Sequence, residues 1–198
     1  AGGPMFYTSG TTGRPKGVRS AAKAAPPIEM MAMMGAGLSS MLSIPPDGVT
    51  LLCGPVYHSA QWAFSYLPLI AGSTVVMRQK FDPVELLELI DRHQVTNIHL
   101  VPTQFHRLLG VADAVKAAFD GSSLKAVWHG AAPCPPDIKR RMIDWWGDVV
   151  YEYYGSTEGS IVTTASAADW RVRPGTVGKA TPMAEIRSVR DDGTPLNY

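Results

Sequence analysis

Residues that could bind phosphate gather near the start of the chain, in residues 7–17, which read YTSGTTGRPKG. Glycines allow backbone N–H groups to close around an anion, and hydroxyl groups donate further hydrogen bonds to it. The residues of these two kinds are Thr8, Ser9, Gly10, Thr11, Thr12 and Gly13. Lys16 adds a compact positive charge, and Arg14 adds a forked one. This segment is therefore predicted to be a loop that holds the phosphates of ATP.

A flexible Ser/Gly linker is the alternative interpretation of the same segment. The GxxxxGK[ST] spacing of a Walker A loop does not occur in the chain. However, an apolar strand is predicted at residues 4–7, directly before the loop, and the loop ends in Pro-Lys-Gly. Because linkers seldom have such surroundings, we favour the phosphate-binding loop.

Alternating strands and helices must position this loop. Apolar runs predict strands at residues 49–53, 74–77, 96–101, 125–129 and 149–153. Helices are predicted at residues 28–42, 58–70, 102–109 and 136–146. The clearest helix follows Asp82, which can cap it, and has Pro83 at its first position and Leu86, Leu87 and Ile90 on an apolar face.

This alternation predicts an α/β fold, a layered and mainly parallel sheet flanked by helices. Ligands of such sheets lie beyond the carboxyl ends of the strands. The first loop and a second Gly/Thr loop at residues 154–159 both follow strands, so we expect them to converge there. The tail from residue 161 is predicted to be irregular and β-rich, with a strand over residues 184–190 that enters an Asp-Asp-Gly turn.

Composition argues against several classes of function. The net charge of the 198 residues is +1, and no basic stripe indicates nucleic acid as a partner. Cys53 and Cys134 lie far apart and fit a reducing compartment. No stretch reads as a transmembrane segment, which needs about 20 mostly apolar residues. We therefore expect a cytoplasmic protein.

Five segments, in order along the chain, resemble signatures of the adenylate-forming superfamily, in its acyl-CoA synthetase branch. They are YTSGTTGRPKGV at residues 7–18, PVYH at 55–58, HGAAP at 129–133, YEYYGSTEG at 151–159 and RPGTVGK at 173–179. The superfamily holds acyl-CoA synthetases, carrier-loading adenylation domains and firefly luciferases. The resemblance covers nearly the whole chain.

This resemblance implies a ligase reaction in two steps. A carboxylate attacks the α-phosphorus of ATP and gives an acyl-adenylate and pyrophosphate, and a thiol, usually that of coenzyme A, then displaces AMP. It implies Mg²⁺ as a cofactor and a carboxylic acid, here a fatty acid, as the substrate. In-line attack builds charge on phosphoryl oxygens, so catalysis would depend on positioning and electrostatic stabilisation.

The resemblance also implies roles for individual residues. The first loop would hold the β- and γ-phosphates, Thr157 the α-phosphate, and Glu158 the Mg²⁺, a cation that takes oxygen ligands. The other residues implied to bind the nucleotide are Gly130, Ala131, Ala132, Tyr153, Tyr154, Gly155 and Ser156. Among these, Tyr154 would stack on adenine. Tyr151 and Tyr153 share a strand face, so packing is the alternative role for Tyr153.

Thr157, Glu158 and His58 are the implied catalytic residues. A lone histidine near aromatic residues is often a core residue, but the resemblance favours a place beside the substrate for His58. We expect it to position the carboxylate or the adenylate, because a carboxylate is already ionised at pH 7 and needs no base. Glu158 on its own could be a solvated loop carboxylate, and its place in YGSTEG favours the metal role.

Other residues that invite a functional interpretation are assigned structural roles. His93, His99 and His106 occupy different elements, so no metal is assigned to them, and Cys134 is not expected to be a nucleophile. Five methionines form a soft apolar set: Met30, Met31, Met33, Met34 and Met41. Core packing is favoured for them over a tunnel for an alkyl chain, which Trp62, Phe64 and Tyr66 would share.

Enzymes of the family that this chain resembles are longer than its 198 residues. We expect residues 1–160 to be a fragment of the α/β AMP-binding core and residues 161–198 to begin a β-rich subdomain, with the small C-terminal domain absent. Without the lid that this domain provides, the piece alone is expected to be inactive. An adenylation enzyme that loads a carrier protein is the runner-up, and a non-catalytic nucleotide-binding module is a third hypothesis.

Overall fold

The structure is a computed structural model that describes residues 5–8, 13–19 and 27–196. Its strands are β1 (Met5–Thr8), β2 (Lys16–Arg19), β3 (Val49–Leu52), β4 (Thr74–Met77), β5 (Asn97–Leu100), β6 (Ala126–His129), β7 (Val150–Ser156), β8 (Ser160–Ala165) and β9 (Lys179–Ala180). Its α-helices are α1 (Ile28–Met41), α2 (Ser59–Ile70), α3 (Pro83–His93), α4 (Pro102–Leu109), α5 (Asp113–Ala118), α6 (Pro136–Trp146) and α7 (Ala167–Val172). A 3-10 helix, η1 (Gly147–Val149), precedes β7. None of these described helices is long and apolar enough to cross a membrane.

The central sheet has the strand order β4-β3-β5-β6-β7-β8-β9. Neighbouring strands from β4 to β7 are parallel, and β8 and β9 are added in antiparallel pairings. Strands β1 and β2 form a separate antiparallel pair. This topology confirms the prediction of a mainly parallel α/β sheet flanked by helices.

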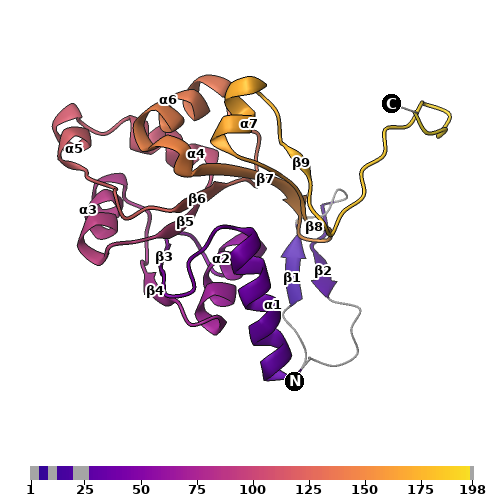
Figure 1. Ribbon diagram of the computed structural model, residues 1–198, viewed down its shortest axis with the longest axis horizontal. Helices are drawn as coiled ribbons and strands as arrows, with labels where there is room; N and C mark the ends of the chain where they lie inside the picture. The colour runs from indigo at the N-terminus through magenta and orange to yellow at the C-terminus, as the bar shows by residue number, and fades with distance from the viewer. Residues whose placement is uncertain (1–4, 9–12, 20–26, 197–198) are drawn as a thin grey trace.

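Helices cover both faces of the sheet, with α1 and α2 on one face and α3, α4, α6 and α7 on the other (Figure 1). The chain moves outward from β3 to β4 and then crosses back to β5, from which it continues toward β6 and β7. The strand order therefore reverses between β3 and β5. In open α/β sheets, the crevice at such a reversal is where ligands bind.

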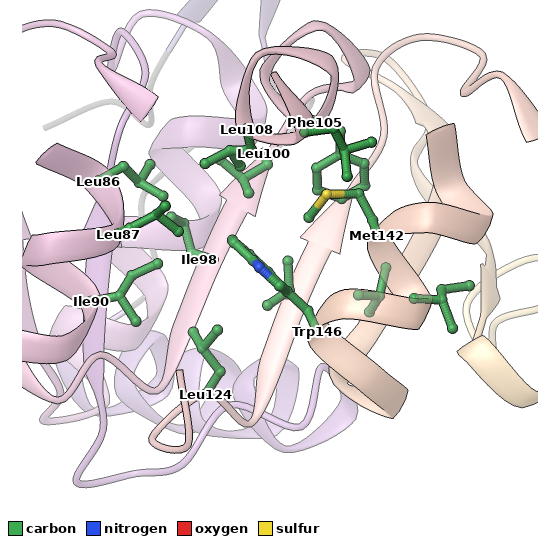
Figure 2. Close-up of a cluster of buried hydrophobic side chains, with 14 of the residues drawn as sticks. Leu86, Leu87, Ile90, Ile98, Leu100, Phe105, Leu108, Leu124, Met142 and Trp146 are labelled. Atoms are coloured by element: carbon green, nitrogen blue, oxygen red, sulfur yellow. The ribbon is translucent and has the colours of Figure 1, made fainter. Parts of the chain in front are cut away.

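The larger hydrophobic cluster packs α3, α4 and α6 against the sheet (Figure 2). Leu86, Leu87 and Ile90 of α3 are buried there, as predicted. The Asp82 carboxylate accepts hydrogen bonds from the backbone N–H groups of Val84 and Glu85, both at 3.0 Å, which confirms the predicted cap. Each fully buried Leu or Ile side chain contributes about 1.5–3 kcal/mol to folding.

A second cluster lies under α1 and α2 and contains Leu42, Ile44, Phe64, Trp128 and Tyr153. The Trp128 indole N–H donates to the carbonyl oxygen of Leu42 at 2.7 Å. Because Leu42 directly follows α1, this buried hydrogen bond fixes the end of that helix against β6.

The predicted loop at residues 154–159 is mostly a β-hairpin, which corrects the sequence-based expectation. Strand β7 continues to Ser156 and β8 begins at Ser160, so the turn contains Thr157, Glu158 and Gly159. Tyr154 and Gly155 pair with β8 across a register shift. This pairing satisfies backbone groups that would be left open if the strand ended at Tyr153. Residue 160, where we expected the α/β core to end, begins a strand of the central sheet.

The tail predicted to be irregular and β-rich from residue 161 contains most of β8, the unpredicted helix α7 and β9, and it is irregular only after β9. The strand expected over residues 184–190 does not form. An isolated bridge joins Val189 to Pro195 in this described part of the chain. The Asp-Asp-Gly turn is present, with the N–H of Gly193 donating to the carbonyl oxygen of Arg190 at 2.8 Å. The chain after β9 extends away from the sheet (Figure 1), so it has no neighbouring strand to pair with. The six-residue helix α5 was not predicted.

Candidate functional site

Two adjoining cavities open where the parallel strands end. The larger has a volume of about 710 Å³ and the smaller about 320 Å³. Both are lined by Phe6, Ser59, Ala60, Ala131 and Thr157, so they meet around these residues. Their position agrees with the expectation that the two Gly/Thr segments converge at the carboxyl ends of the strands.

Polar groups line one part of the larger cavity. Thr8 and Lys16 come from β1 and β2, and Thr157 and Glu158 come from the turn between β7 and β8. The hydroxyl groups of Ser59 and Thr157 are 3.2 Å apart, which joins the start of α2 to this turn. The cavity thus holds an ammonium group, two threonine hydroxyls and a carboxylate, a combination suited to phosphate and an associated cation.

Apolar side chains line the rest of the larger cavity. They include Leu38 near the end of α1, Leu42 after it, Trp62, Phe64 and Leu67 of α2, and Ile161 of β8. The same space therefore offers a polar region and an apolar region. A molecule that carries both phosphate and an apolar group would match this division.

His58 lies beside the smaller cavity rather than the larger one. It occupies the N-cap position of α2 with an extended backbone, and its ring lies 4.7 Å from that of Tyr57. Gly54 after β3 and Val101 after β5 line the same cavity, so this space is located at the reversal of strand order.

A chain of buried hydrogen bonds joins a side chain that lines the larger cavity to two that line the smaller one. Nδ1 of His99 lies 2.9 Å from the amide nitrogen of Gln61, which donates to it, so the ring proton is on Nε2. Nε2 in turn lies 3.1 Å from the phenol oxygen of Tyr153. Gln61 and His99 line the smaller cavity, and Tyr153 lines the larger. The sequence predicted a structural role for His99 but gave no indication of this connection.

Burial determines the protonation of this chain of residues. It lowers the pKa of His99 to about 3 and raises the pKa of Tyr153 to about 12. Both side chains are therefore neutral near pH 7, as the hydrogen-bond pattern requires.

The structure brings several of the predicted nucleotide-binding residues together and leaves others apart. Ser9, Gly10, Thr11 and Thr12 lie outside the described residues. Gly13, which is exposed, has a φ of +79°, in the left-handed region that favours glycine. Ala131, Gly155 and Ser156 line the larger cavity, whereas Gly130, Ala132 and Tyr154 line neither. Tyr154 is 59% exposed, so a base stacked on it would lie at the surface of the protein.

Gly130 is small because the ring of Tyr153 packs directly against it. A Cβ atom at this position would lie 2.6 Å from the ring of Tyr153 and 2.8 Å from its carbonyl oxygen. The glycine thus makes room for Tyr153, which is buried with Phe64 and Trp128. Tyr151 stacks on Trp128 with ring centroids 5.0 Å apart. Tyr151 and Tyr153 therefore both pack on the same face of β7, as predicted.

The aromatic residues of α2 and the methionines of α1 have separate positions. Trp62 and Phe64 line the larger cavity, and Tyr66 stacks on Trp62 with centroids 4.7 Å apart. Met41 packs against the second cluster, but Met30, Met33 and Met34 are exposed. Core packing was therefore the wrong prediction for these three, which line an open groove on the outer face of α1.

The donor set fits a cation that is shared with a nucleotide. Within the described residues, no group of three or more His, Cys, Asp and Glu side chains could hold a metal ion. Mg²⁺ is commonly bound by one or two carboxylates together with substrate phosphates and waters. Glu158, which is exposed at the edge of the larger cavity, could supply such a carboxylate next to bound phosphates.

Comparison with known proteins gives one consistent family. The family model described as AMP-binding enzyme matches residues 4–197. The medium/long-chain-fatty-acid–CoA ligase FadD8 of Mycobacterium tuberculosis is 31% identical over 97% of this chain and 32% of its own length. Two solved structures have a similar fold over 98% of this chain.

One of these structures is the o-succinylbenzoate coenzyme A synthetase MenE of Bacillus subtilis in complex with ATP and magnesium ion. Its TM-score with this chain is 0.78, the two sequences are 27% identical, and this chain covers 38% of its length. The other is the amide bond synthetase McbA of Marinactinospora thermotolerans, with a TM-score of 0.79, 25% identity and 37% covered. The chain thus spans about one third of the length of the proteins that it matches.

Proposed function

This chain belongs to the AMP-binding enzyme family, and on that basis we propose that it forms part of an ATP-dependent acyl-CoA ligase. The observation that carries the proposal is the division of the larger cavity, where phosphate-binding side chains and an apolar lining share one space. An acyl-adenylate has the same division, because it joins a phosphate to an acyl group. The relative FadD8 is a CoA ligase, and MenE is a synthetase with ATP and magnesium bound.

In this proposal, the polar residues bind the triphosphate of ATP. Lys16 and Thr8 contact the β- and γ-phosphates together with the rest of the loop between β1 and β2. Thr157 donates to the α-phosphate, and Glu158 helps to hold Mg²⁺. The ion would offset charge on the phosphates and on the leaving pyrophosphate, and the protein groups supply fixed donors that need no reorganisation during the reaction.

The proposed acid is a fatty acid of medium or long chain. Its alkyl group would occupy the space between Leu38, Leu42, Phe64 and Leu67, which offers apolar contact and few hydrogen-bond partners. FadD8, a medium/long-chain-fatty-acid–CoA ligase, supports this choice, while MenE is a synthetase for o-succinylbenzoate. His58 would position the carboxylate from the side of the smaller cavity, which could also admit the thiol of coenzyme A.

Pyrophosphate release by the full-length protein tests this function. Octanoate, palmitate, ferulate, o-succinylbenzoate and acetate would be compared as substrates, each with and without coenzyme A. We expect the alkyl acids to give the highest kcat/KM, with acyl-CoA formed when coenzyme A is present. A protein that releases no pyrophosphate with any acid would refute the ligase function, and a preference for the aryl acids would refute the fatty-acid assignment.

A Glu158→Gln variant tests the metal assignment separately. It should lower the Mg²⁺-dependent rate by roughly 10- to 100-fold, the range typical when a group that supports a metal site is removed. Glu88→Gln is the matched control, because Glu88 is an exposed carboxylate on α3 that lines neither cavity. Equal rates for the two variants would remove Glu158 from the metal site.

A second candidate function differs in the acceptor of the acyl group. The structural similarity to an amide bond synthetase favours an adenylating enzyme whose acceptor is not coenzyme A, and a carrier protein is one such acceptor. This alternative predicts acid-dependent pyrophosphate release without a coenzyme A thioester product.

A further inference from the structure

A buried cluster of titratable side chains lies on the face of the sheet opposite Tyr153. Lys139 of α6 forms an ion pair with Glu152 of β7, and the two residues are only 1% and 8% exposed. His129 of β6 is fully buried, with Nε2 3.8 Å from the same Glu152 carboxylate. The Lys139 ammonium also lies 5.6 Å from the centroid of the Trp170 ring.

His129 and Glu152 each directly precede a residue that is implied to bind the nucleotide, Gly130 and Tyr153. His129 and Glu152 are register partners where β6 and β7 run side by side. Gly130 and Ala131 follow the end of β6, and Ala131 lines both cavities. Tyr153 follows Glu152 in β7 and lines the larger cavity. A shift of either strand end would therefore move the lining of both cavities.

Because Lys139 and Glu152 are buried, their ion pair tolerates little change in the distance between the two charges. A charge removed from water must be matched by its partner, and removal of one member leaves the other uncompensated in the interior. Burial lowers the pKa of Lys139, while the hydrogen bond and charge of Glu152 raise it. Burial and the Lys139 charge both lower the pKa of His129, whose ring nitrogens have no hydrogen-bond partner within the part of the chain that the structure describes.

The cluster is almost entirely buried, so it presents no charged surface to a partner, and well-packed apolar residues in place of a buried ion pair often stabilise a fold equally well. What the ion pair provides is one fixed distance between α6 and β7. We propose that Lys139 and Glu152 are positioning residues, whose ion pair fixes the ends of β6 and β7 and thereby sets the affinity for nucleotide. This inference rests on the proposed function, because it takes the adjoining cavity to be the nucleotide site.

The test measures the Kd of MgATP for the full-length protein and the KM values for ATP and for the acid. Lys139→Met removes the charge and keeps a long apolar side chain. It should raise the Kd by about 2- to 30-fold, the range in which residues that do not contact a ligand change its binding. The KM for the acid should change much less, because the apolar lining of the cavity comes mainly from α1 and α2.

Two controls separate positioning from loss of stability. Lys125→Met makes the same replacement at an exposed residue just before β6 and should leave the Kd unchanged. Met142→Ala, at a fully buried position of the same helix α6, destabilises the core without altering a charge. If it weakens nucleotide binding as much as Lys139→Met, the ion pair has no specific role.

Glu152→Gln is the second variant, because it keeps the shape of the side chain and remains informative if Lys139→Met does not fold. It should weaken nucleotide binding in the same direction. The double variant should be no weaker than the worse single variant, since the two residues act as one pair. Additive effects, or variants that bind nucleotide like the wild type, would overturn the inference and leave the proposed function intact. A wild-type protein that binds no nucleotide would overturn both.

Discussion

Removal of one oxygen atom tests the buried hydrogen-bond chain of Gln61, His99 and Tyr153. In a Tyr153→Phe variant, the ring can keep its place over Gly130, with its centroid near 5.7 Å from that of Phe64. The phenol oxygen, which lies 3.1 Å from Nε2 of His99, is lost. Because Gln61 donates to the other ring nitrogen, the Nε2–H of His99 would be left buried without an acceptor.

The expected magnitude follows from this single unmet donor. A buried polar group that loses its partner costs about 1–3 kcal/mol, and no cavity term is added because the ring is retained. We therefore expect the free energy of unfolding to fall by about 1–3 kcal/mol. Ionisation of the phenol does not complicate the measurement near pH 7, since burial raises the pKa of Tyr153 to about 12.

Urea unfolding of the full-length protein, followed by tryptophan fluorescence, measures this difference. Tyr154→Phe is the matched control, because Tyr154 is the next residue and is 59% exposed. Surface changes of this kind usually stay within about 0.5 kcal/mol. If Tyr153→Phe also stays within that limit, the His99–Tyr153 hydrogen bond does not stabilise the fold.

Three further predictions follow from buried or capped positions. Gly130→Ala should destabilise the protein by about 1–3 kcal/mol and weaken nucleotide binding, because its Cβ would meet Tyr153 at 2.6 Å; unchanged thermal unfolding would contradict this. Asp82→Ala should cost about 1 kcal/mol, because two backbone N–H groups of α3 lose their acceptor, and urea unfolding would show it. Stability should fall as the pH drops below 6.5, by up to about 1.4 kcal/mol per pH unit for each of His99 and His129, because unfolded histidines bind protons that the folded ones do not. A thermal unfolding temperature that is constant from pH 6.5 down to about pH 5 would contradict the buried neutral histidines.

Helices with clear local start signals were predictable from the sequence. Helices α4 and α6 have the predicted bounds, and α3 begins at the predicted proline. Each of the three has a proline at the start, which fixes φ and needs no N–H partner there. Local chemistry decides such boundaries, so a single sequence contains the necessary information.

The hairpin of β7 and β8 was harder to predict because its pairing depends on a close approach of two backbones. A Cβ on Gly155 would lie 2.0 Å from the carbonyl oxygen of Ser160, so the glycine permits the irregularity between the strands. In the sequence, the same glycine beside polar residues indicates a loop. Only the partner strand reveals that it belongs to a sheet.

The candidate site shows the same division between local and distant information. The motifs identified Thr8, Lys16, Thr157 and Glu158, and the structure places all four on one cavity. Their roles toward ATP and Mg²⁺ stay predictions.

Contacts that support the site join residues far apart in the chain, and no local pattern indicates them. His99 and Tyr153 are separated by 54 positions, and Gln61 and His99 by 38. Lys139 and Glu152 are separated by 13 positions and come from a helix and a strand. The sequence places no two of these residues in contact, because each pair is joined only by the folded chain.

The exposed methionines of α1 show where pattern reasoning gave the wrong answer. The helix is apolar on nearly all sides, which usually indicates burial. Its inner face packs on α2 through Gly35, where a Cβ would lie 2.9 Å from Ile70, while Met30, Met33 and Met34 face outward. Apolar composition alone could not distinguish these two faces.

Acid-dependent exchange of labelled pyrophosphate into ATP reports the adenylation step alone. We expect the full-length protein to catalyse this exchange in the presence of Mg²⁺ and a fatty acid, without coenzyme A, and Glu158→Gln to reduce it. Exchange that is absent with every acid tried, or that proceeds equally well without any acid, would show that the protein does not adenylate a carboxylic acid.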